Sequence, residues 1–449
     1  MHKIFLSALL ALFFVCSLVS CSSDDYVNTI PSNSVALMSI DPTSINEAQG
    51  QTILKHLFGN KDIANSGINL KSKIYAFETI DGNIGFCLSL KSNDKFQEFL
   101  KAPNGQYKCG AIKSKSGCTT TDINGHWAIA FSNDAALIIG PVTPSSLNEV
   151  QQRMSRYLLQ NEEQGIKSSQ IYERLDTMQS PIIFVAKAKA LPDKIVAPFI
   201  LCKKTAAYDY SKIYIEANIV INNNTLVING KTFSFDKEQD KALRETSATY
   251  RKIEGKYIPS FSSNTIAGIY TNISGKEFLP ILQSNPTLQG LLTGINAAID
   301  LDNIIKSIDG DMALRIVGWN NDMPELSLAA QLQDTHWLTD IPYWKESCPQ
   351  GSKITDWKKD AYCYMSGNTS FYFGVSADNQ FFSGATTQTA DQCLTTQKSA
   401  LSPQVQEIIR NGKMVLVLNL SALAGANTKA SDLLRPVLGN LTTIVYNME

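Results

Sequence analysis

Cysteine carries the most readily assigned chemistry in this 449-residue sequence, which contains nine of them. Cys21 ends the tetrapeptide Leu18-Val19-Ser20-Cys21, and the tetrapeptide closes an apolar run, residues 4–19, that follows Lys3 and holds no charged residue. Such a run is typical of a secretion signal and is shorter than the roughly 20 residues of a membrane-spanning helix. The tetrapeptide is typical of the site where lipoproteins are cleaved and a diacylglycerol is attached. We therefore predict that residues 1–20 are a signal peptide and that Cys21 is the lipidated first residue of the mature chain.

The residues after Cys21 indicate where the protein is delivered. Ser22, Ser23, Asp24 and Asp25 resemble the short export signal, rich in Ser and acidic residues, that moves lipoproteins of Bacteroidetes to the outer face of the outer membrane. The alternative is a solvated spacer that keeps the protein clear of the lipid head groups. We predict a tether over residues 21–30 and a cell-surface location, with the periplasmic face as the alternative.

Export would also decide the chemistry of the other cysteines, because disulfides persist in oxidising compartments. Cys109 and Cys118 bracket an expected hairpin in the first half of the chain, and Cys348 and Cys363 bracket the corresponding region of the second half. We predict a local disulfide within each pair. No CxxC motif occurs, so a thioredoxin-like redox role is not indicated. The remaining cysteines of the mature chain lie in apolar surroundings and are expected to be buried: Cys87, Cys202 and Cys393.

Other reactive groups form no recognisable constellation. The mature chain has three histidines, His56, His126 and His336, and none belongs to an HExxH motif or to a His and Cys cluster at metal spacing. The sequence also lacks GxSxG, GxxxxGK[ST] and GxGxxG motifs, so we predict no metal site and no cofactor. A pair of catalytic carboxylates stays possible, because acidic residues are frequent. Four tryptophans in the second half could stack on sugars or pack in the core: Trp319, Trp337, Trp344 and Trp357.

Composition limits the partners. Hydrophobic residues make up 44% of the chain and charged residues 18%, which is typical of a globular protein. Removing the signal peptide takes away Lys3 and no acidic residue, so 39 basic and 41 acidic residues remain and the net charge is −2. Without a basic excess, nucleic acid is not an expected partner. No second apolar run of spanning length occurs, so membrane attachment would depend on the lipid.

An internal repeat organises the elements that would position any site. Residues 32–36 align with residues 263–267, and two further ungapped blocks recur in the same order. These blocks pair Ser132, Asp134, Gly140 and Thr143 with Ser376, Asp378, Gly384 and Thr387, and pair Ser168, Gln170 and Glu173 with Ser402, Gln404 and Glu407. We predict two related halves, residues 31–208 and 257–449, joined by a connector at residues 209–256.

Each half shows the same series of local patterns. A strand (residues 35–40; 266–271) precedes an amphipathic helix (53–57; 278–282), two strands (73–78 and 85–91; 312–318 and 325–333) and a short helix (95–100; 336–343). Thr143 and Pro144 predict the start of a further helix. In the connector, residues 212–221 and 225–235 predict a hairpin, and residues 237–251 a helix. The fold class is therefore α+β, with two related halves, each a mostly antiparallel sheet with helices packed on one face.

The signal, the tether, the opening IPSNSVALMSID and the later NTIAGIY and IDGDMALRI together resemble an uncharacterised family of Bacteroidetes envelope lipoproteins. The resemblance implies a duplicated α+β ectodomain in the envelope, and no activity or site. We expect a lipid-anchored, non-enzymatic protein that binds a protein or glycan partner in a groove between its halves. Two alternatives stay open. One is a glycan or peptidoglycan hydrolase with a carboxylate pair, and the other is a structural subunit of an envelope assembly with a broad apolar sheet face.

Overall fold

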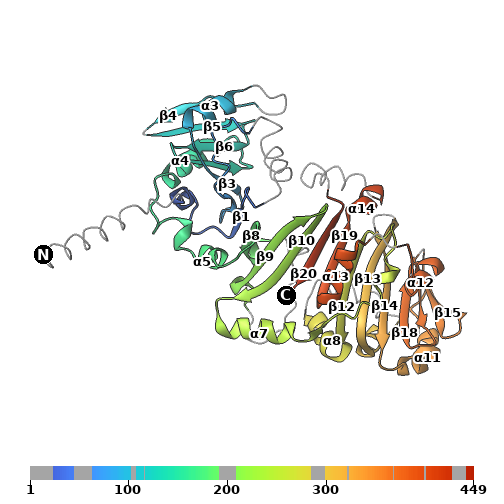
Figure 1. Cartoon of the computed structure of the whole chain (residues 1–449). Helices are drawn as coiled ribbons and strands as arrows, with labels where there is room; N and C mark the ends of the chain where they lie inside the picture. Colours follow the sequence, from blue (N-terminus) through green and yellow to red (C-terminus); the bar gives the residue numbers. More distant parts are fainter. Residues whose placement is uncertain are drawn as a thin grey trace, which may run out of the picture. The chain divides into compact units, whose positions relative to one another are not determined.

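The computed structural model describes residues 24–44, 63–102, 108–115, 117–191, 209–284, 299–320, 323–367, 369–398, 401–426 and 441–449. The chain divides into two compact units, Met1–Thr177 and Met178–Glu449, called here unit 1 and unit 2. Helices are combined with a large, mostly antiparallel β-sheet structure (Figure 1), which confirms the predicted mixture of α and β elements. Among the described residues, no helix is long and apolar enough to cross a membrane.

Unit 1 contains a sheet in which every neighbouring pair of strands is antiparallel. Its strand order is β1 (Ala36–Ile40), β2 (Ile74–Glu78), β3 (Ile84–Ser89), β7 (Ala135–Gly140), β6 (Trp127–Phe131), β5 (Cys118–Ile123) and β4 (Lys113–Lys115). The helices of unit 1 are α3 (Asn93–Lys101), α4 (Leu147–Tyr157) and α5 (Gln170–Asp176), with short 3₁₀ helices η1 (Asp25–Thr29) and η2 (Ile166–Ser168).

Helices α3 and α4 form where the sequence predicted helices. Ser92 caps α3, and Phe96, Phe99 and Leu100 bury its apolar side in the unit 1 core. In α4, Val150 and Met154 are buried, as the predicted stripe requires. The start of α4 was predicted too early, because the Thr143 hydroxyl bonds the hydroxyls of the following serines in a turn and the helix begins only at Leu147.

The predicted tether is partly folded. Residues 25–29 form η1, and Tyr26, Val27 and Ile30 are buried in unit 1. Apolar side chains at these positions gain more from burial than from solvation, so the segment packs onto the sheet and does not extend into solvent. The tether predicted over residues 21–30 therefore does not include residues 26–30, which belong to the folded unit.

Unit 2 contains a longer sheet. Its strand order is β8 (Ile182–Lys187), β9 (Ile213–Asn222), β10 (Thr225–Ser234), β20 (Thr443–Met448), β19 (Met414–Asn419), β12 (Ala267–Ser274), β13 (Ile308–Asn320), β14 (Met323–Leu332), β18 (Gln380–Gly384), β17 (Thr369–Val375), β16 (Ala361–Ser366) and β15 (Ser352–Lys358). β10 and β20 run parallel, and the other neighbours in this order are antiparallel. The two-residue strand β11 (Tyr250–Arg251) pairs with β12.

The predicted connector is an integral part of this sheet. Its hairpin is confirmed as β9 and β10, and Asn223 and Asn224 adopt positive φ angles of 45° and 60°, as a two-residue hairpin turn requires. However, residues 225–230 pair with residues 443–448 of β20, so the hairpin is a structural strand pair and not a linker. The helix after it, α7 (Lys237–Ser247), is shorter than predicted because the chain enters β11.

Helices cover both faces of the unit 2 sheet, whereas one covered face was predicted. One face carries α7, α8 (Gly275–Ser284), α10 (Leu301–Lys306), η6 (His336–Asp340) and α11 (Ile341–Glu346), and the other carries α12 (Thr387–Gln392) and α13 (Pro403–Asn411). The alternation along β14 shows this arrangement, since Ala330 packs in the first cluster and Ala329 in the second. A further helix, α14 (Leu420–Ala426), follows β19.

Candidate functional site

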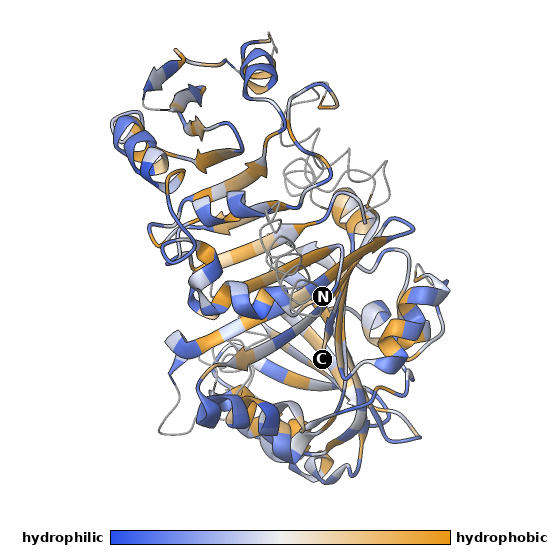
Figure 2. Ribbon diagram, turned by 60° about the vertical axis from the view of Figure 1, so that its left-hand side comes forward, coloured by the Kyte–Doolittle hydropathy of each residue, from blue (hydrophilic) through white to orange (hydrophobic). Residues whose placement is uncertain are grey.

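The strands of the unit 2 sheet are rich in hydrophobic residues (Figure 2). Their register places apolar side chains on one face of seven neighbouring strands, β9, β10, β20, β19, β12, β13 and β14. In β19, Leu416 and Leu418 lie on this face and are half-buried, while Val415 and Val417 on the opposite face are fully buried. The register aligns them with side chains of the other strands. We call the following set the apolar face: Ile219, Ile221, Leu226, Ile228, Ile444, Tyr446, Leu416, Leu418, Ile269, Leu314, Ile316, Leu326 and Leu328.

The apolar face becomes more exposed toward the β13–β14 hairpin. Leu326 is 39% exposed, and Trp319, which pairs with Pro324 near the hairpin turn, is 40% exposed. Strands whose apolar side chains point to both faces of a sheet are typical of sheets covered on both sides. Six strand spacings give the face a width of about 29 Å. Most of its side chains are half-buried, and Leu326 is its exposed member.

The other end of this side of the sheet is filled by the helices of unit 2. Trp337 and Trp344 stack with ring centroids 5.9 Å apart and are 3% and 4% exposed, so they pack in the core. Trp357 packs edge-on against Tyr372. Of the four tryptophans considered as sugar-stacking groups, Trp319 is exposed, Trp357 is half-buried, and Trp337 and Trp344 are buried.

A cavity of about 240 Å³ opens between α7 and the ends of β10 and β20. Its apolar part includes Leu243 and Met448, and its charged part includes Lys231, Arg244 and Lys413. The Arg244 guanidinium is held by Asp240 at 2.7 Å. The remaining lining residues are Thr232, Ser247, Ala248, Tyr250 and Glu449.

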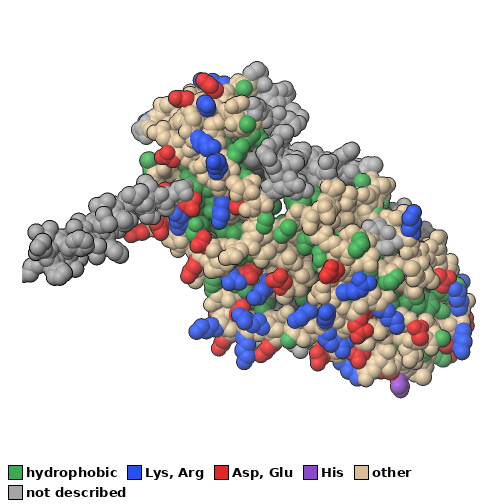
Figure 3. Space-filling model, viewed as in Figure 1, with side chains coloured by type: hydrophobic (Ala, Val, Ile, Leu, Met, Phe, Trp, Pro, Cys, Tyr) green, Lys and Arg blue, Asp and Glu red, His purple; other side chains and the backbone are tan. Residues whose placement is uncertain are grey.

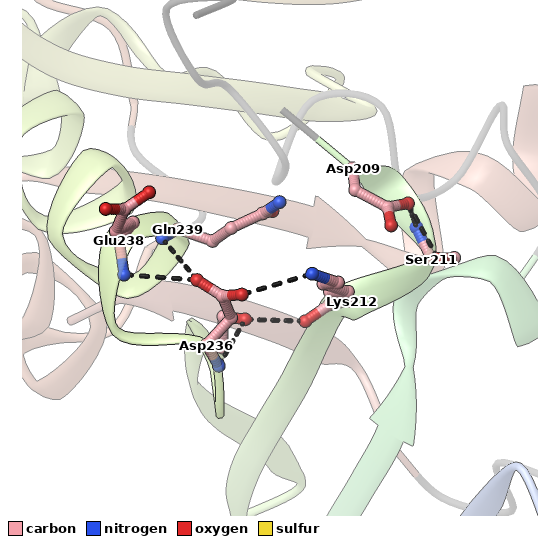
Figure 4. Close-up of polar contacts among 7 residues, drawn as sticks. Asp209, Ser211, Lys212, Asp236, Glu238 and Gln239 are labelled. Atoms are coloured by element: carbon pink, nitrogen blue, oxygen red, sulfur yellow. Dashed lines mark hydrogen bonds and ion pairs between the residues drawn. The ribbon is translucent and has the colours of Figure 1, made fainter. Parts of the chain in front are cut away.

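Helix α7, which walls this cavity, is fixed to the β9–β10 hairpin through its first turn (Figure 4). The Asp236 carboxylate accepts hydrogen bonds from the backbone N–H groups of Glu238 and Gln239, and the Lys212 ammonium donates to it at 3.1 Å. The Lys212 contact and these backbone bonds hold the pKa of Asp236 below its usual range. Ser234 completes the junction, because its hydroxyl donates to the Lys212 carbonyl.

A larger groove, of about 840 Å³, lies between the 252–254 segment and α13. It brings together two carboxylates, Glu254 and Glu407, and two cations, Lys252 and Arg410, all of them exposed. The groove therefore presents exposed charges of both signs. On the face of unit 2 drawn in Figure 3, cationic and anionic side chains are likewise interspersed.

The loop at this groove is held by a buried carboxylate. Asp311 is 2% exposed, and its oxygens accept hydrogen bonds from the backbone N–H groups of Glu254, Gly255 and Lys256 at 2.7–2.9 Å. The Asn272 amide donates to the same carboxylate at 3.0 Å. This arrangement gives the groove a rigid wall before any ligand arrives.

Residues 43–422 match the model of a family described as a domain of unknown function, DUF4836. The chain belongs to this family. No curated protein matches it. Among solved structures, the DUF4836 chain is similar to two crystal forms of TP0453. Form IV has 11% identity and a TM-score of 0.30, covering 44% of this chain and 76% of that one, and form III has 10% identity and a TM-score of 0.24, covering 80% and 92%. At these TM-scores the likeness supports no conclusion about fold or function.

In this DUF4836 chain, the predicted disulfide partners of the first half are apart. Cys109 lies opposite Ile123, at the far end of β5 from Cys118. Five residue steps along β5 separate these positions by about 16 Å, whereas bridged cysteines need Cα atoms within about 7 Å. The Cys109 sulfur lies 3.3 Å from the Thr121 hydroxyl, and the Cys118 sulfur 3.3 Å from the Ser155 hydroxyl.

The second predicted pair is not joined either. Cys363 lies opposite Thr355 of β15, and Cys348 precedes that strand and packs against the core beside α11. All six described cysteines are free thiols. Burial raises the pKa of Cys87 to about 12 and that of Cys393 to about 11, and both were predicted to be buried. Cys21, the predicted lipidation site, and Cys202 lie outside the described residues.

The histidines are separate from one another. His126 has its Nδ1 3.3 Å from the Val142 carbonyl, and the side chain of His336 is 91% exposed beside Asp334. His56 lies outside the described residues. Within the described part of the chain, no group of three His, Cys, Asp or Glu residues could hold a metal ion.

A broad apolar sheet face was one of the alternatives from the sequence, but its residues were not identified there, although their signal is present. The run MVLVL at residues 414–418 is apolar at every position, and residues 313–317 and 326–330 are nearly so. Period-two alternation identifies a strand with one buried face, so a strand that is apolar on both faces is identified only as a strand. Which residues of neighbouring strands share a face depends on the register, and the sequence alone does not give it.

Proposed function

We propose that this member of the DUF4836 family is a lipid-anchored, non-enzymatic protein of the cell envelope that binds a protein partner through the apolar face. The observation that carries the proposal is the continuity of that face over seven strands with Leu326 and Trp319 exposed at its end. The lipid anchor at Cys21 and the outer-membrane surface are supported by the signal sequence and the Ser and Asp residues that follow it. The predicted groove between the halves stays a prediction.

A protein partner fits this face better than a glycan. Its members are mostly Ile and Leu, which release water when another apolar surface covers them. Sugars bind through stacking on aromatic rings and through dense polar contacts, and the face offers Tyr446 and the adjacent Trp319 as its aromatic groups. The same apolar face also favours the alternative of a structural subunit in an envelope assembly. Such a subunit would form a longer-lived complex than a protein that binds its partner reversibly.

The duplication inferred from the sequence is part of the proposal. The order β1-β2-β3-β7-β6-β5-β4 in unit 1 and the order β12-β13-β14-β18-β17-β16-β15 in unit 2 match strand for strand, with every pair antiparallel. The helices match in sequence order too, since α4 and α12 follow the fourth strand of each order and α5 and α13 come next. Such agreement supports two copies of one ancestral fold.

Photo-crosslinking in intact cells tests the partner-binding proposal. A benzophenone amino acid placed at Trp319 or Leu326 should give a discrete protein adduct, because both positions lie at the exposed end of the apolar face. The same group at Tyr343, which is 69% exposed on α11, is the matched control and should give none. Equal adducts at all three positions, or none, would contradict the proposal. Protease treatment of intact cells tests the location, since full resistance before lysis would exclude surface display.

A further inference from the structure

The chain becomes part of the core of unit 1 immediately after the proposed lipid anchor. Val27 and Ile30 are fully buried, and Tyr26 is 5% exposed. The Tyr26 hydroxyl donates to the Lys73 carbonyl at 2.6 Å, and the Thr29 hydroxyl lies 3.3 Å from the Cys87 sulfur. Residues 26–30 are therefore held by the fold and cannot serve as a flexible spacer.

The length of chain left between lipid and fold is short. From Cys21 to Asp25 there are four peptide steps, which reach about 14 Å when fully extended. A folded unit of about 150 residues has a radius of gyration of about 15 Å. An anchor at Cys21 therefore cannot lift unit 1 from the lipid surface by as much as its own radius.

The surface around the point where the chain emerges is identifiable. The Gln160 amide donates to the Asn28 carbonyl at 3.0 Å, so residues 158–165 lie beside the N-terminal segment. Leu159, next to Gln160, is 74% exposed, the highest value among the exposed large hydrophobic residues. Helix α5 is close as well, because it packs against η2, which lies beside η1. Burial and then the carboxylates of Asp176, Asp24 and Glu162 raise the pKa of Tyr172 in α5. We call residues 158–165 together with α5 the anchor side of unit 1.

We propose that the anchor side of unit 1 rests directly on the lipid surface, with Leu159 in the interface. This inference depends on the proposed lipid anchor at Cys21. The anchor side is acidic, since Glu162, Glu163, Glu173 and Asp176 are exposed and Arg174 is its one cation. Carboxylates are repelled by anionic head groups over a Debye length of about 10 Å at 0.1 M salt. The matching surface is therefore one of zwitterionic lipid, where Leu159 contributes apolar contact without charge repulsion.

Hydrogen exchange of the full lipidated chain on phosphatidylcholine vesicles tests the proposal. Amides of residues 158–165 should exchange about threefold or more slowly than in the unlipidated chain mixed with the same vesicles, because contact with lipid suppresses local opening. Amides of the β4–β5 hairpin, at the opposite edge of the unit 1 sheet from β1, should not change. Vesicles containing phosphatidylglycerol should give weaker protection of residues 158–165.

The matched variant carries twelve Gly and Ser residues inserted between Ser23 and Asp24. It keeps the lipid and the whole fold but lengthens the reach, so the protection should disappear. The intact mass reports the lipid at Cys21 separately. A lipidated wild-type chain without protection of residues 158–165, or a long-spacer variant that is protected equally, overturns the inference and leaves the anchor standing. A chain without lipid overturns both.

Discussion

Replacing Asp311 by Asn should destabilise unit 2 by about 3 kcal/mol. The carboxylate accepts four hydrogen bonds, three from backbone N–H groups at residues 254–256 and one from Asn272. An Asn side chain keeps one accepting oxygen and turns the other into a donor, so two of these bonds are lost. Hydrogen bonds to a charged group contribute about 1.5–3 kcal/mol each. The lower figure applies, because Glu254 and Lys256 are exposed and water can replace part of what is lost.

The control substitution lies two residues away on the same strand. Asp309 pairs with Arg251 at 2.7 Å, but both side chains are more than 40% exposed, so Asp309→Asn should cost less than about 1 kcal/mol. Urea denaturation followed by tryptophan fluorescence measures both changes, since Trp337 and Trp344 report on the unit 2 core. If Asp311→Asn shifts the urea transition no more than Asp309→Asn does, the hydrogen bonds from residues 254–256 to the buried carboxylate do not stabilise unit 2.

Two further predictions concern ionisable groups. The lowered pKa of Asp236 means that its contact with Lys212 stabilises the fold above the unfolded carboxyl pKa of about 3.9 and is lost as the pH falls through the lower folded value. Asp236→Asn, which keeps the helix cap, should therefore lower the urea midpoint at pH 7, and the difference from the wild type should shrink as the pH falls below about 3.9. For the thiols, Cys109 and Cys348 should react with a disulfide reagent at pH 8 in the native protein, while Cys87 should react only after unfolding, because burial raises its pKa to about 12. A disulfide at either predicted pair would instead leave two fewer thiols in the unfolded, unreduced protein.

Local chemistry made part of the fold predictable. The three asparagines at residues 222–224 predict the β9–β10 turn because Asn tolerates positive φ, and two of them adopt it. The start of α13 could likewise be predicted from local residues, because Ser402 caps the helix and Pro403 occupies its first turn. The helix that corresponds in unit 1 is capped by Ser169 and not by Ser168, the residue that aligns by letter. In the proposed duplication, the matching letters therefore lie one residue away from the match between the two helix caps.

Long-range pairing made the rest unpredictable. From the sequence spacing, Cys109 and Cys118 were expected at the two ends of a hairpin. In the structure, the backbone of Cys109 pairs with Ile123, so the two cysteines lie at opposite ends of β5. The parallel pairing of β10 with β20 joins segments more than 200 residues apart, and the sequence of neither strand predicts which strand it pairs with. The apolar face depends on that pairing and on five others, so it could not be predicted from any one strand.

The proposed duplication also predicts where the two units differ at the proposed binding surface. Ala36 in β1 and Ala267 in β12 align in the sequence repeat. In unit 1, Ala36 pairs with Glu78, which in turn pairs with Ile84. In unit 2, Ala267 pairs with Ile316, which in turn pairs with Leu326. Ile84 is 47% exposed, so both copies expose an apolar residue at this place. In unit 1, however, the face is interrupted by Glu78, a carboxyl whose pKa is raised by partial burial.

Ile316→Glu therefore gives unit 2 the chemistry of unit 1 at one position of the apolar face. The variant should fold, because the equivalent place in β2 already holds a half-buried Glu, and its circular dichroism and urea transition should show this. It should lose the photo-crosslinked adduct at Leu326, since a charge must be desolvated before an apolar partner can cover it. Glu78→Ile is the reciprocal control and should leave that adduct unchanged. A folded Ile316→Glu protein that still forms the adduct would show that the partner does not contact the apolar face.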